Sequence, residues 1–205
     1  APIEIKEADI TKGGADITLN AGEGDDIVNI AQSLVGTLTV INTDVGDDVI
    51  NVGGAITALT AIAGELTING SDHNDTLNIT AAADTAGVVA IFNAYTIVST
   101  TIPAGTITFN DIELVDVNLG SGNDELTVTQ LLSHVTLSLA GATGDDSFVI
   151  GAVLPSGGRS LAEIDGVFTL DGQAGTDTIL IDNAGDVVAN NVTITHDEVA
   201  FAIVD

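Results

Sequence analysis

The residues best suited to chemistry in this sequence are aspartates that close a short unit repeated along the chain. Each copy has a Gly, usually an acidic or amide residue, then Asp, then an apolar segment. The closing aspartates are Asp26, Asp48, Asp75, Asp124, Asp146 and Asp177, and acidic residues precede three of them at Asp25, Asp47 and Asp145. Carboxylate oxygens bind hard cations, and calcium accepts six to eight oxygen ligands at flexible geometry. The repeat therefore predicts calcium sites.

Glycine stands two residues before the closing Asp in all copies but one. These turn glycines are Gly24, Gly46, Gly122, Gly144 and Gly175, while His73 takes the place in the third copy. Gly at a fixed turn position indicates a backbone with positive φ, and Asp and Asn favour turns because they hydrogen-bond nearby backbone. We expect tight turns that expose backbone carbonyl oxygens beside the carboxylates.

The elements that position these turns are short β-strands. Residues two and four places after each closing Asp are apolar in all six copies, and the residues between them are mixed. This period of two is typical of a half-buried strand. Residues seven places before the Asp are also apolar, so a second strand is expected to lead into each turn.

The spacing of the copies predicts a higher order. Asp26 and Asp124 are 98 residues apart, as are Asp48 and Asp146, whereas Asp75 and Asp177 are 102 apart. We interpret the chain as an all-β parallel β-helix or β-solenoid of about eight coils. It would form a continuous rod of two tandem modules, residues 1–106 and 107–205, with the acidic turn on one side of each coil. Residues 88–104 are the least regular, and the segment FNAYTIVSTTIPAG (92–105) is expected to form a protruding loop.

In such a stack, equivalent residues of neighbouring coils lie about 4.8 Å apart. Carboxylates at that distance repel by about 0.9 kcal/mol even in water, and by more near a protein surface. A column of them favours a bound cation. The alternative is that the Gly-Asp pairs are simply corners of the solenoid, with water and sodium balancing the charge.

Two segments resemble the calcium-binding nonapeptide of RTX (haemolysin-type) β-rolls: AGEGDDIVN at 21–29 and LGSGNDELT at 119–127. The phrases LGSGND, GQAGTDT and IDNAGD are also similar to the β-strand repeats of giant bacterial surface proteins. The resemblance implies that the closing aspartates and turn carbonyls coordinate calcium between coils. It also implies secretion to the bacterial cell surface or an extracellular location. Asp182 and Asp186 in IDNAGD form a second candidate ligand group.

Composition excludes several classes of function. The 3 Lys and Arg against 30 Asp and Glu give a net charge of −27, which disfavours nucleic acids and anionic membranes. No apolar run is long enough to span a membrane, so membrane insertion is not expected. The absence of Cys excludes disulfides. The chain begins Ala-Pro, which suggests a processed chain or a fragment.

The sequence thus predicts a non-catalytic, calcium-binding structural module of a secreted filament or adhesin. Expected partners are calcium, other copies stacked end to end or a longer repeat chain, and surface glycans. A glycan-binding or an ice-binding solenoid is the alternative. Ice binding is considered because Thr-x-Thr recurs at 37–39, 106–108, 127–129 and 193–195. A polysaccharide-degrading β-helix is less favoured: Asn42-Thr43-Asp44 and Asp47-Asp48 are similar to polygalacturonase motifs, but the Gly-His-Gly and Arg-Ile-Lys segments are missing. His73, His134 and His196 are interpreted as solvated surface residues.

Overall fold

The computed structural model describes residues 3–5, 16–54, 56, 58–100, 102–103, 106–186 and 202–203, with backbone only for 3–5 and 202–203. Almost all regular structure in these ranges is β-strand, and one 3-10 turn, η1 (Leu59–Ala61), interrupts it. The predicted all-β class and the parallel pairing of strands are confirmed. In the described part of the chain, no helix has the length and apolar character needed to span a membrane.

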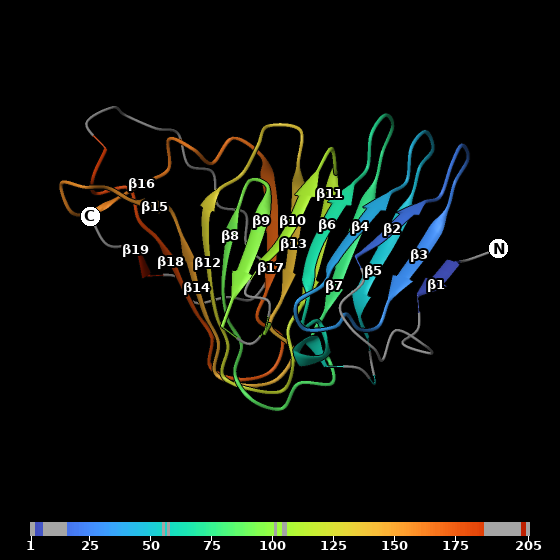
Figure 1. Cartoon of the computed structure of the whole chain (residues 1–205). Helices are drawn as coiled ribbons and strands as arrows, with labels where there is room; N and C mark the ends of the chain where they lie inside the picture. Colours follow the sequence, from blue (N-terminus) through green and yellow to red (C-terminus); the bar gives the residue numbers. More distant parts are fainter. Residues whose placement is uncertain are drawn as a thin grey trace.

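Sheet A contains only parallel strands, which follow one another along the molecule in chain order (Figure 1). They are β1 (Ile3–Ile5), β3 (Ile27–Ile30), β5 (Val49–Gly53), β7 (Thr76–Thr80), β11 (Leu114–Asn118), β13 (Thr136–Ala140) and β17 (Val167–Asp171).

Sheet B is larger and runs in the order β19-β18-β14-β12-β8-β9-β10-β6-β4-β2. Strand β9 is antiparallel to both of its neighbours, and the other neighbouring pairs are parallel. The bounds are β2 (Ile17–Asn20), β4 (Leu38–Asn42), β6 (Glu65–Asn69), β8 (Val89–Asn93), β9 (Thr96–Ser99), β10 (Thr106–Asn110), β12 (Glu125–Gln130), β14 (Ser147–Ile150), β18 (Thr178–Ile181) and β19 (Ala202–Ile203). A separate antiparallel pair joins β15 (Ala152–Val153) and β16 (Arg159–Ser160).

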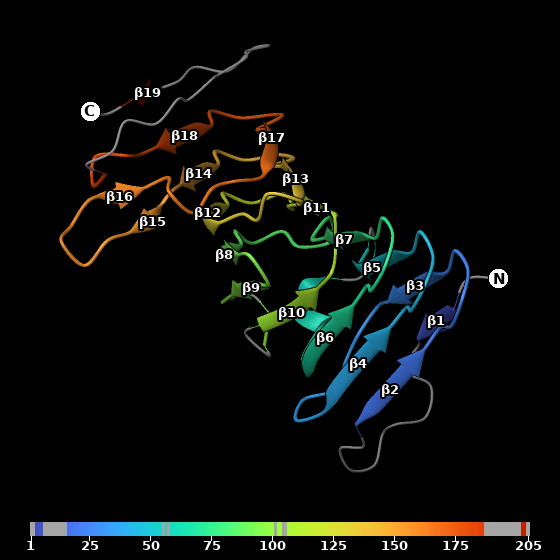
Figure 2. The same ribbon diagram turned by 90° about the horizontal axis from the view of Figure 1, so that it is seen from above.

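The two sheets face each other across one hydrophobic core (Figure 2). Alternate residues of β5, β7 and β12, for example, point into it, as the period of two predicts. The apolar residues two and four places after the closing aspartates of the first five copies are buried, for example Leu77 and Ile79. In the last copy Ile179 is buried and Ile181 is partly buried. The repeat thus supplies the inner layer of both sheets.

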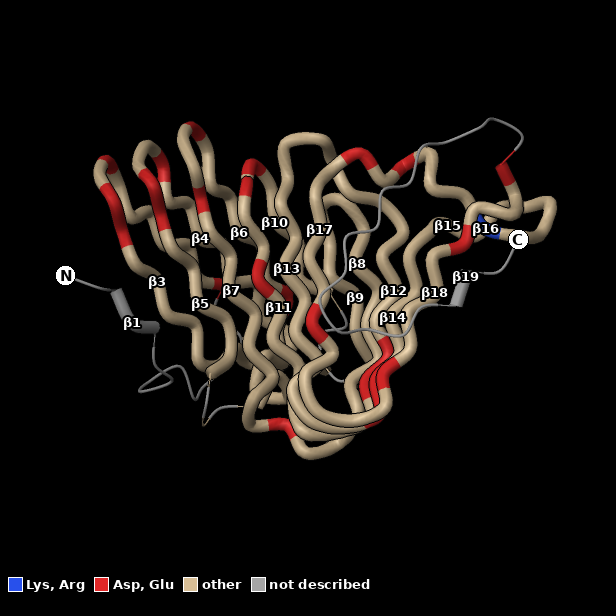
Figure 3. The backbone as a smooth tube through the Cα atoms, turned by 180° about the vertical axis from the view of Figure 1, so that it is seen from behind, with Lys and Arg blue, Asp and Glu red and all other residues tan. Residues whose placement is uncertain are grey.

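The acidic turns connect the sheets in opposite directions in the two halves of the chain. In the N-terminal half they lead from β2, β4 and β6 in sheet B to β3, β5 and β7 in sheet A. In the C-terminal half they lead from β11, β13 and β17 in sheet A to β12, β14 and β18 in sheet B. Because the strands of sheet A are parallel, the two sets of turns lie at opposite edges of the molecule (Figure 3). The prediction that all acidic turns share one side was wrong.

This reversal of the turn direction is produced by residues 88–99, which overlap the segment 92–105 that was expected to form a protruding loop. They instead contribute β8 and β9, and the chain then continues into β10 within the same sheet. Sheet B thus receives three successive strands before the chain crosses to β11 in sheet A. The next acidic turn therefore follows a strand of sheet A, not one of sheet B.

Candidate functional site

Where sheet B leads into sheet A, the carboxylates of Asp48, Asp75 and Glu113 each accept a backbone hydrogen bond from the preceding turn. The amide of Asp26 donates to Oδ1 of Asp48 at 2.7 Å, and the amide of Asp48 donates to Oδ1 of Asp75 at 2.9 Å. The amide of Asp75 donates to Oε2 of Glu113 at 2.9 Å. We define the N-terminal acidic edge as Asp26, Asp48, Asp75 and Glu113.

The C-terminal acidic edge, defined as Asp124, Asp146 and Asp177, repeats this arrangement. The amide of Val88 donates to Oδ1 of Asp124 at 2.6 Å, and the amide of Asp124 donates to Oδ1 of Asp146 at 2.9 Å. The amide of Asp146 donates to Oδ1 of Asp177 at 3.0 Å. Both edges therefore use carboxylates to tie successive turns together.

The residues one place before the closing aspartates make a second ladder of opposite direction. Oδ1 of Asp25 accepts from the amide of Asp47, and Oδ1 of Asp47 accepts from the amide of Asn74, both at 3.1 Å. At the other edge, Oδ1 of Asp145 accepts from the amide of Thr176 at 2.8 Å. These outer side chains are exposed, so one carboxylate oxygen of each can also face solvent.

Four of the closing aspartates have a carboxylate oxygen that is buried without a hydrogen-bond partner. Oδ2 of Asp48, Asp75, Asp124 and Asp146 is buried and has no hydrogen-bond partner. These residues are at most 2% exposed. A buried carboxylate oxygen without a partner is costly, because it loses hydration and gains nothing in return. Such an atom would be satisfied by a proton on the carboxyl group, by a bound water molecule or by a cation.

The surroundings of these carboxyls change their acidity. Burial, followed by the negative charges of Asp48, Glu113 and Asp47, raises the pKa of Asp75 to about 6. Burial, followed by the charges of Asp146 and Asp84, raises the pKa of Asp124 to about 6. Burial, with the charges of Asp177 and Asp145, also raises the pKa of Asp146. In each case the hydrogen bond accepted from the backbone opposes the shift without cancelling it.

The turn glycines lie where no other residue fits easily. A Cβ on Gly46, Gly144 or Gly175 would overlap the carbonyl oxygen of the turn glycine in the preceding copy. A Cβ on Gly122 would lie 2.5 Å from the amide nitrogen of Gly87. The predicted positive φ is observed at Gly24, Gly46, Gly144 and Gly175, and His73 adopts it too, at 93°. Gly122 does not adopt it, so the prediction is wrong at that turn. Close stacking and positive φ together explain the repeated glycine.

Glu113 is a member of the ladder that the search for Gly-Asp units missed. It stands in the gap between Asp75 and Asp124, and its turn has no glycine two places earlier. One signal was present: Val115 and Val117, two and four places later, are apolar and buried as in the other copies. A longer side chain thus substitutes for Asp in the shortened turn.

The second predicted ligand group, Asp182 and Asp186, does not share one set of contacts, because each carboxylate accepts a hydrogen bond from a different partner. Oδ1 of Asp182 accepts from the amide of Ala184 at 2.9 Å within its own turn. Oδ1 of Asp186 accepts from the hydroxyl of Ser160 at 2.8 Å. Within the described ranges, no three His, Cys, Asp or Glu side chains converge as a metal-binding group.

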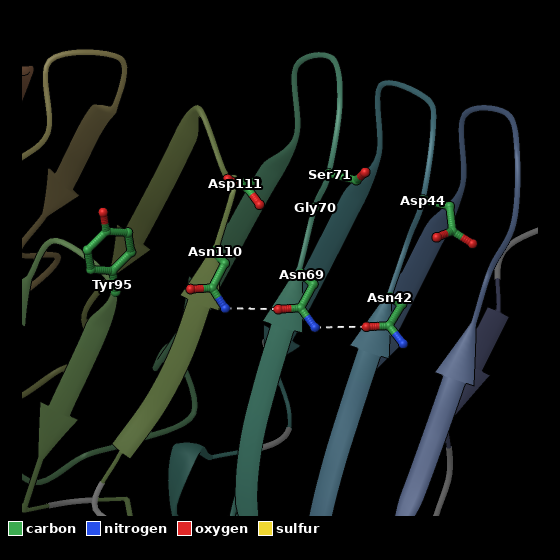
Figure 4. Close-up of a pocket in the computed structure, with 8 residues that line it drawn as sticks. All are labelled: Asn42, Asp44, Asn69, Gly70, Ser71, Tyr95, Asn110 and Asp111. Carbon is green, nitrogen blue, oxygen red and sulfur yellow. Dashed lines mark hydrogen bonds between the residues drawn. The ribbon is translucent and has the colours of Figure 1, made fainter.

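A row of asparagines marks the outer face of sheet B next to the N-terminal acidic edge. Nδ2 donates to the neighbouring Oδ1 from Asn42 to Asn20 at 2.8 Å, from Asn69 to Asn42 at 2.8 Å and from Asn110 to Asn69 at 2.9 Å. A groove of about 470 Å³ lies over this row (Figure 4). It is lined by Asn42, Asp44, Asn69, Gly70, Ser71, Tyr95, Asn110 and Asp111.

Other residues singled out in the sequence have simpler positions. Thr37 and Thr39 are buried, so this Thr-x-Thr pair does not face solvent, and residues 193–195 lie outside the described residues. His73 and His134 are exposed, and His196 lies outside the described residues. No protein-family model, curated protein or solved structure matches the chain.

Proposed function

We propose that this chain is a non-catalytic structural module, a parallel β-solenoid whose acidic turns bind calcium. In the proposal it forms two tandem modules, residues 1–106 and 107–205, of a secreted filament or adhesin at a bacterial cell surface. The chain would assemble end to end with further copies or with adjoining repeats. The observation that carries the calcium proposal is the set of four buried Oδ2 atoms without a hydrogen-bond partner.

The donor atoms available fit calcium. The turns offer carboxylate and backbone carbonyl oxygens, which are the ligands that calcium prefers, and the chain has no Cys. A Cβ on Gly70 would overlap both Oδ2 of Asp75 and the carbonyl oxygen of Asp111, so these two oxygens lie around the same point. A Cβ on Gly141 would overlap Oδ2 of Asp146 and lie 2.7 Å from the carbonyl oxygen of Gly172.

Each proposed site would contain one buried carboxylate, with carbonyl oxygens and water as the remaining ligands. This composition agrees with the absence of a converging group of three acidic side chains in the described residues. A bound calcium ion would neutralise the buried carboxylates and reduce repulsion along each edge. The chain's own contribution is to hold each carboxylate in place through the amide hydrogen bond to Oδ1.

A calcium titration of the EDTA-treated protein tests the proposal, with far-UV circular dichroism and thermal melting as readouts. We expect the Tm to rise with calcium, because a ligand that binds only the folded state stabilises it by about 2.7 kcal/mol per site at a hundredfold excess over Kd. Magnesium should not substitute, because it demands a stricter octahedral geometry. Sodium chloride at matched ionic strength controls for screening.

Two variants localise the effect. Asp146→Asn keeps the acceptor for the amide of Asp124 but removes the charge, and we expect it to reduce the calcium-dependent rise in Tm. Asp165→Asn removes one exposed charge that belongs to neither acidic edge as defined above, and it should leave that rise unchanged. If calcium and EDTA give the same Tm, the acidic turns are plain corners and the calcium proposal fails, whereas the solenoid proposal survives.

A further inference from the structure

The asparagine row on sheet B has a free end. Its three amide–amide hydrogen bonds all point the same way, from β10 toward β2. Oδ1 of Asn110, the last acceptor, takes no hydrogen bond from the described residues and faces the side on which Tyr95 lies (Figure 4). Aligned hydrogen bonds polarise one another, which strengthens the acceptor at the end of the chain.

The row also retains binding capacity along its length. A side-chain amide has two N–H donors and an oxygen with two lone pairs. Asn42 and Asn69 each use one donor and one lone pair within the row. One donor and one lone pair of each therefore remain for a ligand. The row holds these groups rigidly at the strand spacing, about 4.8 Å.

Tyr95 provides an aromatic surface at one end of the groove. It lies between β8 and β9 and is 50% exposed. Its carbonyl oxygen accepts a hydrogen bond from the amide of Phe109 in β10 at 2.8 Å. This bond fixes the residue beside Asn110 independently of its side chain. The ring is the only tyrosine of a chain that has no Trp.

The lining of the groove selects the class of ligand. It contains the carboxylates of Asp44 and Asp111 and no Lys or Arg, which disfavours anionic ligands. A compact cation would need the ring and a carboxylate at one point. In Figure 4, Asp44 lies at the opposite end of the groove from Tyr95, and the carboxylate of Asp111 points away from the ring. An extended ligand with many hydroxyl donors and one apolar face fits the whole length. We propose that this groove binds a neutral oligosaccharide, with one sugar stacked on Tyr95.

A second asparagine row shows that the hydrogen bonds alone do not make the site. On the outer face of sheet A, Asn51 donates to Asn29 and Asn78 donates to Asn51, both at 2.8 Å. Its end at Asn78 lies beside Asp116 of β11, with no aromatic residue on that strand. We interpret this row as a stabiliser of the strands only. Asn78 is therefore the matched control for Asn110.

Tyrosine fluorescence reports on the groove directly, because Tyr95 is the only tyrosine. We would titrate the whole chain with cellohexaose, xylohexaose, mannohexaose and maltohexaose, and confirm the affinity by calorimetry. At least one hexasaccharide should change the fluorescence with a Kd below about 1 mM. Tyr95→Ala and Asn110→Ala should each weaken calorimetric binding by at least about tenfold. Tyr95→Phe and Asn78→Ala should change it by less than about twofold.

The titrations are repeated in EDTA and in calcium, because this inference goes beyond the proposed function and does not require calcium. Circular dichroism checks that each variant is folded. The inference is overturned if none of the four hexasaccharides binds, if choline or polygalacturonate binds in their place, or if Asn78→Ala weakens binding as much as Asn110→Ala. A calcium-dependent Tm without sugar binding would leave the proposed function intact and remove only this site.

Discussion

The N-terminal acidic edge carries the chain from sheet B to sheet A, whereas the C-terminal acidic edge carries it from sheet A to sheet B. The local structure is nevertheless the same at both edges. Gly46 and Gly144 both have positive φ and both stack on the preceding turn glycine. Asp48 and Asp146 both accept the amide of the preceding closing Asp. The repeat therefore encodes a turn and its contact with the next turn, and does not encode which sheet the strand enters.

The edges differ in how their ladders end. The N-terminal acidic edge ends on Glu113, which reaches Asp75 from a shortened turn. The C-terminal acidic edge begins with the amide of Val88, which precedes β8 and belongs to no acidic turn. Both ends lie near the segment in which the chain adds β8, β9 and β10 to sheet B before it returns to sheet A. Substitutions at equivalent positions can therefore test whether the two edges are energetically equivalent.

The largest effect is expected where turns stack most closely. Gly144→Ala places a Cβ against the carbonyl oxygen of Gly122 in a backbone with φ of 144°. We expect it to destabilise the fold by about 4 kcal/mol through strain and overpacking. Gly24→Ala, with φ of 106° and open space around the Cβ, should cost only about 1 kcal/mol. Urea unfolding of both variants measures the difference, and equal losses would show that stacking is unimportant.

The next effect concerns buried charge. The pKa of Asp75 and of Asp124 is raised from 3.8 to about 6, so the folded state retains these protons to higher pH than the unfolded state does. Their contribution to stability is fully present below about pH 4 and is lost as the pH rises through 6. A difference of about 2 pH units corresponds to about 3 kcal/mol for each group. In EDTA, the protein should therefore be more stable at pH 4 than at pH 8.

Asp124→Asn should reduce that pH dependence, because the side-chain amide of Asn still accepts a hydrogen bond from Val88 but does not ionise. At pH 8 in EDTA, we expect the variant to be more stable than the parent by up to about 3 kcal/mol. Melting in concentrated sodium chloride separates this effect from repulsion among exposed charges, which salt screens. An Asp124→Asn variant with an unchanged slope of stability against pH would contradict the assignment.

The smallest effect is expected from substitutions of the last hydrogen-bond acceptor at each acidic edge. Glu113→Ala leaves the amide of Asp75 without its acceptor, and Asp177→Ala does the same to the amide of Asp146. Each should cost about 2 kcal/mol, the penalty for an unsatisfied buried donor. Glu113→Gln retains the acceptor and should cost less than about 1 kcal/mol. Chemical unfolding checks this order, and a much larger loss for Asp177→Ala would show that the edges are not equivalent.

The inner layer of the sheets and the shape of the turns could be predicted from the sequence because both depend on local patterns. The apolar residues two and four places after each closing Asp were correctly placed in strands, and the positive φ at His73 follows from its alignment with the glycines. The role of the side chains was less visible. Sequence spacing placed the aspartates near one another, but only the structure shows that Oδ1 of all but Asp26 accepts a backbone amide from a neighbouring turn.

Two features could not be predicted from the sequence: the reversed direction in which the C-terminal acidic turns connect the sheets, and the groove on sheet B. The sequence patterns that accompany both features are weak. The hairpin between β8 and β9 turns at Ala94 and Tyr95, without the Asn-Gly or Asp-Gly pair that is typical of two-residue hairpin turns. Tyr95 and Asn110 are 15 positions apart along the chain and become neighbours only because β9 pairs with β10. The spacing of repeated motifs relates equivalent positions in different copies. It therefore gives no information about contacts made by a segment without a second copy, such as the β8–β9 hairpin.

The hairpin of β8 and β9 also determines where folding can begin. Asn93 pairs with Thr96 across a two-residue turn, whereas parallel neighbours such as Asp75 and Glu113 are 38 residues apart. The entropy of loop closure rises with the length of the loop, so local antiparallel pairs form faster than distant parallel ones. The hairpin lies inside sheet B, between β10 on one side and β12 on the other. We therefore expect folding to nucleate in the middle of the chain and to proceed outward toward both ends, with each completed strand serving as the template for the next.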